Sequence, residues 1–332
     1  MNMLKHEIAE KIANVNMFEI AQKTEYKANL LTNDEKEIVA ELDKWAKEIG
    51  ETGADPDRQI ASFIRKTVEE EVYNAPEEIL DMMFNRGSIG EFDDYKATVM
   101  AKNKLQAYEA AKGGNVDRSY LDISVLKPAW KHLQVETDIS YADLRRNGWK
   151  TVATLTNFAV ETLKNKMFQI LFNIVDTGIK SGAENYINET TAKPTQATMD
   201  AMALYINDRA DGQGVIVTLS KYIQAASKLT GFVSDEMRNE VHRTGRLGSY
   251  DGVTMAQISG AHKLADGSTQ LKDKRMYGIA GKIGDCDMKG DVRVYETMDD
   301  DNEIVKIKVT GFEFGYSFNA DTLEKICKVV LA

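Results

Sequence analysis

A group of acidic residues in the last quarter of the chain follows most of a calcium-loop template. Asp285, Asp287, Gly290 and Glu296 stand where the pattern D-x-D-x-[DN]-G-x5-E requires them. Lys289, however, places a cation where that pattern needs a ligand oxygen. The flanking segments have the alternation of strands, whereas a calcium loop of this type joins two helices. We therefore expect a polar turn between strands here and no metal site.

Other chemistry-bearing residues lack the spacing that a site would need. Three glycines (Gly278, Gly281 and Gly284) have the wrong separation for a phosphate loop, and no adequate helix follows them. The run from Glu69 to Glu71 is typical of a solvated helix face. Nucleophile-elbow, zinc-protease and Walker motifs are absent from the sequence. We expect no catalytic residue, no cofactor and no metal, and therefore no enzyme.

The histidines and cysteines support the same expectation. None of the four histidines has a cysteine or carboxylate at ligand spacing, and the two cysteines are far apart, which favours buried free thiols in a reducing compartment. These residues are His6, His132, His242 and His262, with Cys286 and Cys327. An α+β enzyme that uses Cys286 or a carboxylate pair is the alternative, and gel filtration would identify it as a small oligomer.

Composition limits the function classes further. The 332 residues carry a formal net charge of -10, with 43% hydrophobic and 28% charged residues, as in ordinary globular proteins. A dedicated nucleic-acid reader usually has a basic face, so this balance argues against one. The N-terminus lacks the apolar stretch of a signal peptide, and the longest apolar run, near Ile170 to Val175, is too short to cross a bilayer. We expect a soluble protein without a membrane partner.

Helical signals fill the first ninety or so residues. Thr32 and Glu35 form a capping box, and Asp55 with Pro56 opens the next helix. Each predicted helix has a narrow apolar seam, for example the stripe Ile60, Ile64, Val68 and Val72. Such short helices suggest an arm laid on other surfaces rather than an independent core.

A long hairpin and a long helix follow the arm. Tyr95 to Glu109 and Tyr120 to Thr137 are predicted strands around a glycine turn, with Pro128 and Trp130 interrupting the second. From Trp149 to Ile179 apolar residues recur every three or four positions, which predicts a helix about 45 Å long. A two-stranded ribbon is marginal alone in water. We expect another copy of the chain to cover it.

From Asp211 the pattern becomes mixed α/β. Val215 to Thr218 predicts a buried strand, a glycine-rich loop runs from Thr244 to Gly252, and a long strand is expected from Glu303 to Phe318. The predicted fold class is α+β, with early and late parts of the chain sharing one layer.

This order of parts, together with three local stretches, resembles the major capsid proteins of tailed bacteriophages, which have the Hong Kong 97-like fold. The stretches are HRTGRLGSYDGVTM (residues 242–255), KRMYGIAGKIGD (274–285) and EIVKIKVTGFEFGYSFNADTLEKICKV (303–329). The resemblance covers residues 60 to 332. It implies an N-terminal helical arm, an extended β-hairpin loop, a peripheral domain with a long spine helix, and an axial α/β domain. The implied bounds are 1–93, 94–137, 138–200 with 291–318, and 201–290 with 319–332, in that order.

The resemblance also implies a function and partners. Copies would form the hexamers and pentamers of an icosahedral head that encloses double-stranded DNA, in the virion capsid after assembly in the host cytoplasm. A portal is an expected partner, and DNA would be packaged without sequence-specific binding. Because the arm is short and Met1 is present, we expect a separate scaffolding protein rather than a cleaved leader.

The expected inter-subunit residues lie in two loops. The hairpin tip consists of Lys112, Gly113, Gly114 and Asn115, and the axial loop near the capsomer axis contains Gly245, Arg246, Leu247 and Gly248. Family members can cross-link through a hairpin-tip lysine, but nothing else here supports that reaction, so Lys112 is expected to be a solvated lysine. The alternative with the same fold is an encapsulin-like nanocompartment, which would contain a cargo protein instead of nucleic acid.

Overall fold

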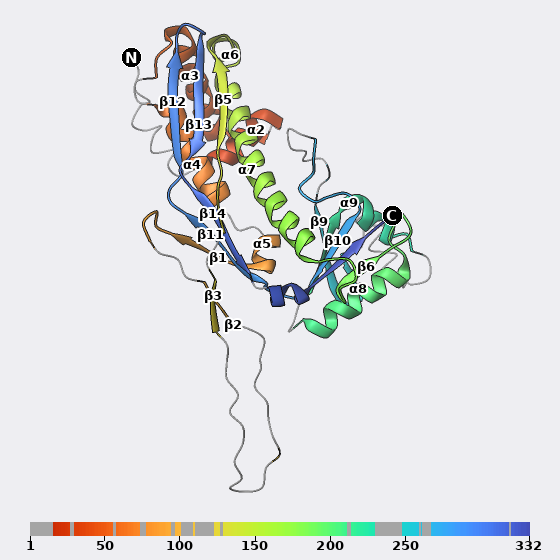
Figure 1. Cartoon of the computed structure of the whole chain (residues 1–332). Coiled ribbons are helices and arrows are strands. Elements are labelled where there is room, and N and C mark those ends of the chain that lie inside the picture. The colour runs from red at the N-terminus through yellow and green to blue at the C-terminus, as the bar shows by residue number, and fades with distance from the viewer. Residues whose placement is uncertain are drawn as a thin grey trace. The chain divides into compact units, whose positions relative to one another are not determined.

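The computed structural model describes residues 16–26, 30–55, 58–73, 78–93, 97–100, 109, 123–126, 129–210, 214–229, 248–258, 260, 267–318 and 320–332. The chain divides into two compact units (Figure 1). Unit 1 consists of Met1–Pro76, Lys131–Lys164 and Lys289–Glu313, and unit 2 of Glu77–Trp130, Asn165–Met288 and Phe314–Ala332. Each unit is described below by itself.

The centre of unit 1 is a three-stranded antiparallel sheet. Its strands are ordered β12 (Arg293–Asp299), β13 (Ile304–Thr310) and β5 (Val135–Ser140). In β13, buried Val305, Ile307 and Val309 alternate with partly exposed lysines, as expected for a sheet with one solvated face. On that face Lys308 lies opposite Glu136, so neighbouring strands carry opposite charges.

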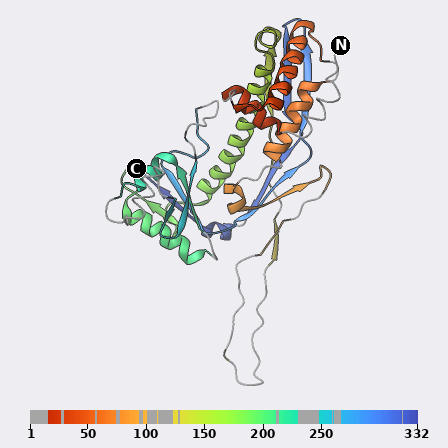
Figure 2. The same ribbon diagram turned by 180° about the vertical axis from the view of Figure 1, so that it is seen from behind.

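Helices cover the other face of this sheet. They are α2 (Met17–Tyr26), α3 (Asn33–Thr52), α4 (Gln59–Val68) with the π-helical turn η2 (Glu69–Tyr73), and α6 (Tyr141–Asn147). The capping box predicted at Thr32 and Glu35 is confirmed. Helix α4 packs on β12, and α3 packs on α6 (Figure 2).

The packing of α3 and α4 shows what covers their apolar faces. Their apolar seams, which include Ile38, Leu42, Ile60 and Ile64, are buried against the chain's own sheet and helices. Within the subunit, the apolar faces of residues 33–68 are thus covered by the chain itself, and the assignment of residues 1–93 as an N-terminal helical arm stays a prediction. Seams this narrow are sufficient here because each helix has a sheet or a second helix to cover it.

The long helix predicted from Trp149 is confirmed as α7 (Trp149–Gly178). Its first amide donates to Oδ1 of Asp43 on α3 at 3.2 Å, so a distant carboxylate caps the helix. Trp149 itself is fully buried and its ring lies edge-on to Phe63. Helix α7 supplies its first half to unit 1 and its second half to unit 2.

Unit 2 contains a six-stranded mixed sheet in which β7 is completely buried. Its order is β6 (Tyr186–Asn188), β15 (Ile326–Val330), β10 (Arg275–Ile279), β7 (Val215–Leu219), β9 (Val253–Ile258) and β8 (Ser249–Tyr250). Strands β7 and β9 are parallel, as are β15 and β6, and β10 is antiparallel to both of its neighbours. Helices α8 (Gln196–Arg209) and α9 (Ser220–Ala226) pack on this sheet.

A second sheet has the order β1 (Phe84–Ile89), β11 (Gly284–Lys289), β14 (Glu313–Phe318) and β4 (Ala129–His132). The short helix α5 (Glu78–Met83) precedes β1, and the 3-10 helix η3 (Ala320–Lys325) precedes β15. Because β11 pairs within this sheet, Asp285 to Lys289 form a strand. The polar turn that we expected there is displaced to Gly290, where φ is 83°.

The predicted hairpin is confirmed at its base. Strand β2 (Ala97–Met100) pairs antiparallel with β3 (Ile123–Leu126). The remainder of the hairpin, including its expected tip, lies outside the described residues. The second predicted strand is not continuous to Thr137, because β4 and β5 pair in two other sheets. Of the two residues expected to interrupt this strand, Pro128 lies outside the described residues and Trp130 is part of β4.

Candidate assembly surfaces and buried charge clusters

Seven of the eight predicted contact residues lie outside the part of the chain that the structure describes. These are Lys112, Gly113, Gly114, Asn115, Gly245, Arg246 and Leu247. The eighth, Gly248, is exposed, and its carbonyl accepts a hydrogen bond from the amide of Met255 at 2.8 Å. This bond joins the end of the expected axial loop to β9. The roles of the two loops stay predictions.

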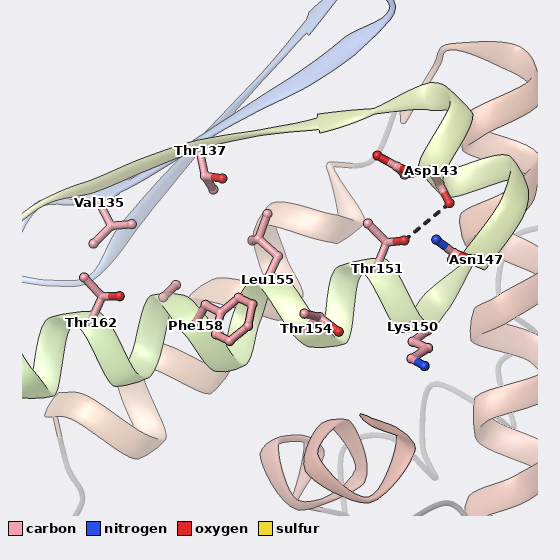
Figure 3. A pocket seen from close by; sticks show the side chains of 11 residues that line it. Val135, Thr137, Asp143, Asn147, Lys150, Thr151, Thr154, Leu155, Phe158 and Thr162 are labelled. Atoms are coloured by element: carbon pink, nitrogen blue, oxygen red, sulfur yellow. Dashed lines mark hydrogen bonds between the residues drawn. The ribbon is translucent and has the colours of Figure 1, made fainter. Parts of the chain in front are cut away.

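An open trough of about 500 Å³ lies in unit 1 between β5 and the first half of α7 (Figure 3). Val135 and Thr137 face it from β5, and Leu155 and Phe158 rise from α7 on the opposite side. Its other lining residues are Asp143, Asn147, Lys150, Thr151, Thr154, Ala159 and Thr162. The sheet ends at β5, so this edge of α7 has no further strand to cover it.

Phe158 is the residue that makes this trough unusual. Its side chain is 54% exposed, although it lies on a helix whose neighbouring positions Asn157 and Ala159 are buried. At the end where α6 meets α7, the Thr151 hydroxyl donates to the carbonyl of Asp143 at 3.3 Å. That bond ties the two helices together and defines one end of the trough.

Other large apolar side chains are also exposed. They are Leu30, Phe92, Leu204 and Tyr295. Phe92, at 93%, is the most exposed of them and lies in the turn that follows β1. Sequence reasoning missed Phe92 and Phe158. The sequence could have indicated the exposure of Phe92 only through its two acidic neighbours, Glu91 and Asp93.

Unit 2 contains a buried cluster of opposite charges. Oδ1 of Asp176 on α7 accepts hydrogen bonds from Lys328 at 2.8 Å, Tyr277 at 3.0 Å and Arg275 at 3.1 Å, while Oδ2 accepts one from Lys272 at 2.9 Å. Burial alone would raise the pKa of Asp176, but the donors outweigh it and hold that pKa well below its usual range. The cluster joins α7 to β10 and β15, so we interpret it as a structural anchor.

Unit 1 contains a buried carboxyl group whose pKa is raised, in contrast to that of Asp176. Glu296 on β12 is buried, and its Oε2 accepts a hydrogen bond from the amide of Ala61 in the first turn of α4 at 3.1 Å. The side chain of Asp55 accepts a hydrogen bond from the amide of the preceding residue, Ile60, at 3.1 Å. Burial, and then the charge of Asp55, raises the pKa of Glu296 to about 7. Two carboxyl groups therefore share the N-terminus of α4.

The residues that could have done chemistry are occupied in other ways. Asp285 accepts a hydrogen bond from the Asn85 side chain at 3.1 Å. Cys286 and Cys327 are buried free thiols, as predicted, and burial raises the pKa of each to about 12, which makes them poor nucleophiles. Among the described residues no group of three or more histidine, cysteine or acidic side chains could hold a metal ion.

Comparison with known protein families identifies the class of protein that carries these surfaces. A family model described as "SPbeta prophage-derived putative capsid protein YonB" matches residues 1–320. The chain belongs to this family. This capsid protein has no match among curated proteins. No helix in its described part is long and apolar enough to span a membrane.

Solved phage capsids have the same fold as this capsid protein. A Gordonia phage Cozz structure is 12% identical with a TM-score of 0.54, covering 77% of this chain and 87% of that one. The capsid of Cyanophage P-SCSP1u is 9% identical with a TM-score of 0.51, covering 76% and 88%. The capsid of a native GTA particle is 10% identical with a TM-score of 0.51, covering 79% and 93%. The mixed helix and sheet fold of this chain is therefore one that solved capsid proteins also have.

Proposed function

We propose that this capsid protein assembles into the hexamers and pentamers of an icosahedral phage head that encloses double-stranded DNA. The observation that carries the proposal is the family match over residues 1–320, which the fold shared with solved phage capsids supports. Closed shells of this kind repeat one set of contacts between identical subunits. Contacts that are individually modest then hold a subunit firmly, because several neighbours engage it together.

The proposal assigns parts of the chain to the Hong Kong 97-like plan. The ribbon that begins with β2 and β3 is the extended loop, α7 is the spine helix, and the six-stranded sheet of unit 2 is the core of the axial domain. Glycine-bearing residues 245–248 are then placed near the capsomer axis, and residues 112–115 at the tip of the loop. A two-stranded ribbon gains stability when another surface covers it.

The proposal also includes partners. A net charge of -10 suits a container wall that must not hold DNA tightly, because phosphate contacts require an excess of lysine and arginine. We expect DNA to be enclosed without sequence-specific binding. A separate scaffolding protein and a portal would direct assembly in the host cytoplasm.

A loop deletion tests this function. The full-length chain and a variant lacking residues 104–118 are each produced together with the products of the flanking genes. We expect shells from the full-length chain only, because the deletion removes the outer part of the loop that overlaps a neighbour. The variant should still unfold cooperatively at a temperature close to that of the parent. Normal shells from the variant would contradict the role given to the loop.

The content of the shells distinguishes a phage head from a nanocompartment. Nuclease-protected double-stranded DNA in particles made in the presence of the packaging machinery is the result we expect. Shells that contain a co-purifying protein and no nucleic acid would contradict the phage assignment.

A further inference from the structure

Two acidic side chains from outside the helix hold the N-terminus of α4. The amide of Ile60 donates to Oδ2 of Asp55 at 3.1 Å. The amide of Ala61 donates to Oε2 of Glu296 on β12, also at 3.1 Å. The N-cap residue, Arg58, provides no side-chain hydrogen bond and has a left-handed φ of 49°. Asp55 and Glu296, the acid pair, therefore take the place of the usual N-cap side chain.

The acid pair is one hydrogen-bond donor short. Glu296 is 7% exposed, and its second oxygen, Oε1, is buried and meets no hydrogen-bond donor among the described residues. Asp55 is also 7% exposed, and its side chain lies within hydrogen-bond reach of Glu296. Two buried carboxylates this close repel each other, whereas a proton on Oε1 of Glu296 can be donated to Asp55. A single proton therefore satisfies both side chains.

The cation beside the acid pair is too exposed to replace that proton. Arg58 lowers the pKa of Glu296, but the arginine is exposed, so water and salt screen its charge. From β13, the residue paired with Glu296 is the apolar Ile307. Burial and the charge of Asp55 outweigh Arg58, and the pKa of Glu296 is raised as a result.

The groups on α6 and in the turn after β12 add no positive charge. Tyr141 on α6 interacts electrostatically with Glu296, and its phenol donates to Oδ1 of Asp300 at 2.9 Å. Burial raises the pKa of Tyr141 to about 12, so this phenol is neutral near pH 7. Loss of the shared proton therefore leaves two buried negative charges that only the first amides of α4 and the screened arginine oppose.

We propose that Asp55 and Glu296 share one proton that clamps the first turn of α4 to β12, and that loss of this proton releases the turn locally. The surrounding structure limits the movement, because β12 pairs with β13 along its whole length and the later turns of α4 bury Ile64 and Val68. Release also relieves the left-handed backbone at Arg58. The inference concerns the single subunit and does not depend on the proposed function.

Hydrogen exchange of the full-length chain tests the release. Peptides that cover residues 59–64 are followed by mass spectrometry between pH 5 and 8, and each rate is divided by the rate of an unstructured peptide at the same pH. We expect protection to fall about tenfold or more from pH 5 to pH 7 and then to level off, because the released turn leaves Glu296 with its ordinary acidity.

The first turn of α8 is the internal control. There the hydroxyl of Thr195, which does not titrate in this range, accepts a hydrogen bond from the amide of Thr198 at 3.4 Å. Protection of residues 196–201 should therefore stay constant between pH 5 and 8.

Two substitutions separate a shared proton from burial alone. Glu296→Gln has a permanent donor toward Asp55 and keeps an acceptor for α4, so protection of residues 59–64 should become independent of pH. Asp55→Asn removes the second negative charge, so the fall in protection should end at a lower pH than in the parent. Glu136→Gln is the matched control on the solvated face of β5, and it should keep the profile of the parent.

Constant protection of residues 59–64 across this pH range in the parent would overturn the proposal. An equal fall in residues 196–201 would do so as well, because the loss would then be global unfolding rather than local release. A profile of Asp55→Asn identical to that of the parent would show that the two acids share no proton. These three outcomes are read without Glu296→Gln, so they decide the matter even if that variant does not fold.

Discussion

The ammonium group of Lys328 lies 2.8 Å from Oδ1 of Asp176, and it also donates to the backbone carbonyls of Asp176 at 2.7 Å and Ile179 at 3.3 Å. One lysine on β15 thus neutralises a buried carboxylate and closes the last turn of α7. The side chains are only 7% and 10% exposed. The carboxylate also has Arg275 and Tyr277 as donors, so the group is fully satisfied.

Removing that lysine should destabilise unit 2 strongly. Lys328→Met keeps an apolar stem of similar length but removes the ammonium group. The carboxylate of Asp176 then has one buried cation fewer, and the backbone carbonyls of Asp176 and Ile179 lose the hydrogen bonds that Lys328 donated. We expect a loss of about 3–5 kcal/mol in the free energy of unfolding, measured by urea denaturation. Lys47→Met is the control, because the ion pair of Lys47 with Asp43 is exposed at the surface, and this substitution should change stability little. Equal effects of the two substitutions would contradict the anchor.

The pH dependence of unit 1 should depend on Glu296. Its pKa is raised to about 7 in the fold, whereas an unfolded glutamate titrates at about 4.3. The fold therefore favours the protonated form. The stability that this carboxyl contributes is complete below about pH 4.3 and is lost as the pH rises through about 7.

Glu296→Gln should remove that dependence, because an amide stays neutral and can still accept from Ala61. At pH 8 we expect the variant to be more stable than the parent by about 1–3 kcal/mol, with the difference vanishing near pH 4. Urea denaturation between pH 4 and 8 measures it. Glu136→Gln, on the solvated face of β5, is the control, and its free energy of unfolding should depend on pH as that of the parent does. A parent whose stability does not fall between pH 5 and 8 would refute the assignment.

Gly50 permits the close approach of α3 to α6. A Cβ at this position would lie 2.7 Å from the amide nitrogen of Arg145 and 2.9 Å from the carbonyl oxygen of Tyr141. These are backbone atoms and cannot move aside easily. Gly50→Ala should therefore cost about 1–3 kcal/mol despite the higher helix propensity of alanine. Gly260→Ala, where nothing lies within 4 Å, is the matched control, and thermal unfolding compares the two.

Local signals predicted the helices well. The capping box at Thr32 and the apolar period after Trp149 depend on residues a few positions apart, and both helices are found where they were expected. The partners of these helices were not predictable in the same way. The seam with Ile60 and Ile64 indicates a covered face, but nothing in it states that the cover is β12 of the same chain.

Contacts between distant residues set the limits of prediction. Lys328 and the carbonyl of Asp176 are 152 positions apart, and neither position carries a local pattern that indicates the pair. The exposure of Phe158 depends on the sheet ending at β5, which the strand patterns do not reveal. Asp285 to Lys289 matched a calcium template by composition, yet pairing in a sheet makes this segment a strand.

Electron microscopy of the full-length chain, purified after production with the flanking gene products, tests the central claim most directly. We expect closed icosahedral shells in which a reconstruction resolves fivefold and sixfold rings of this chain. A chain that stays a compact 37.1 kDa monomer or a small oligomer under those conditions would contradict its assignment as the shell subunit.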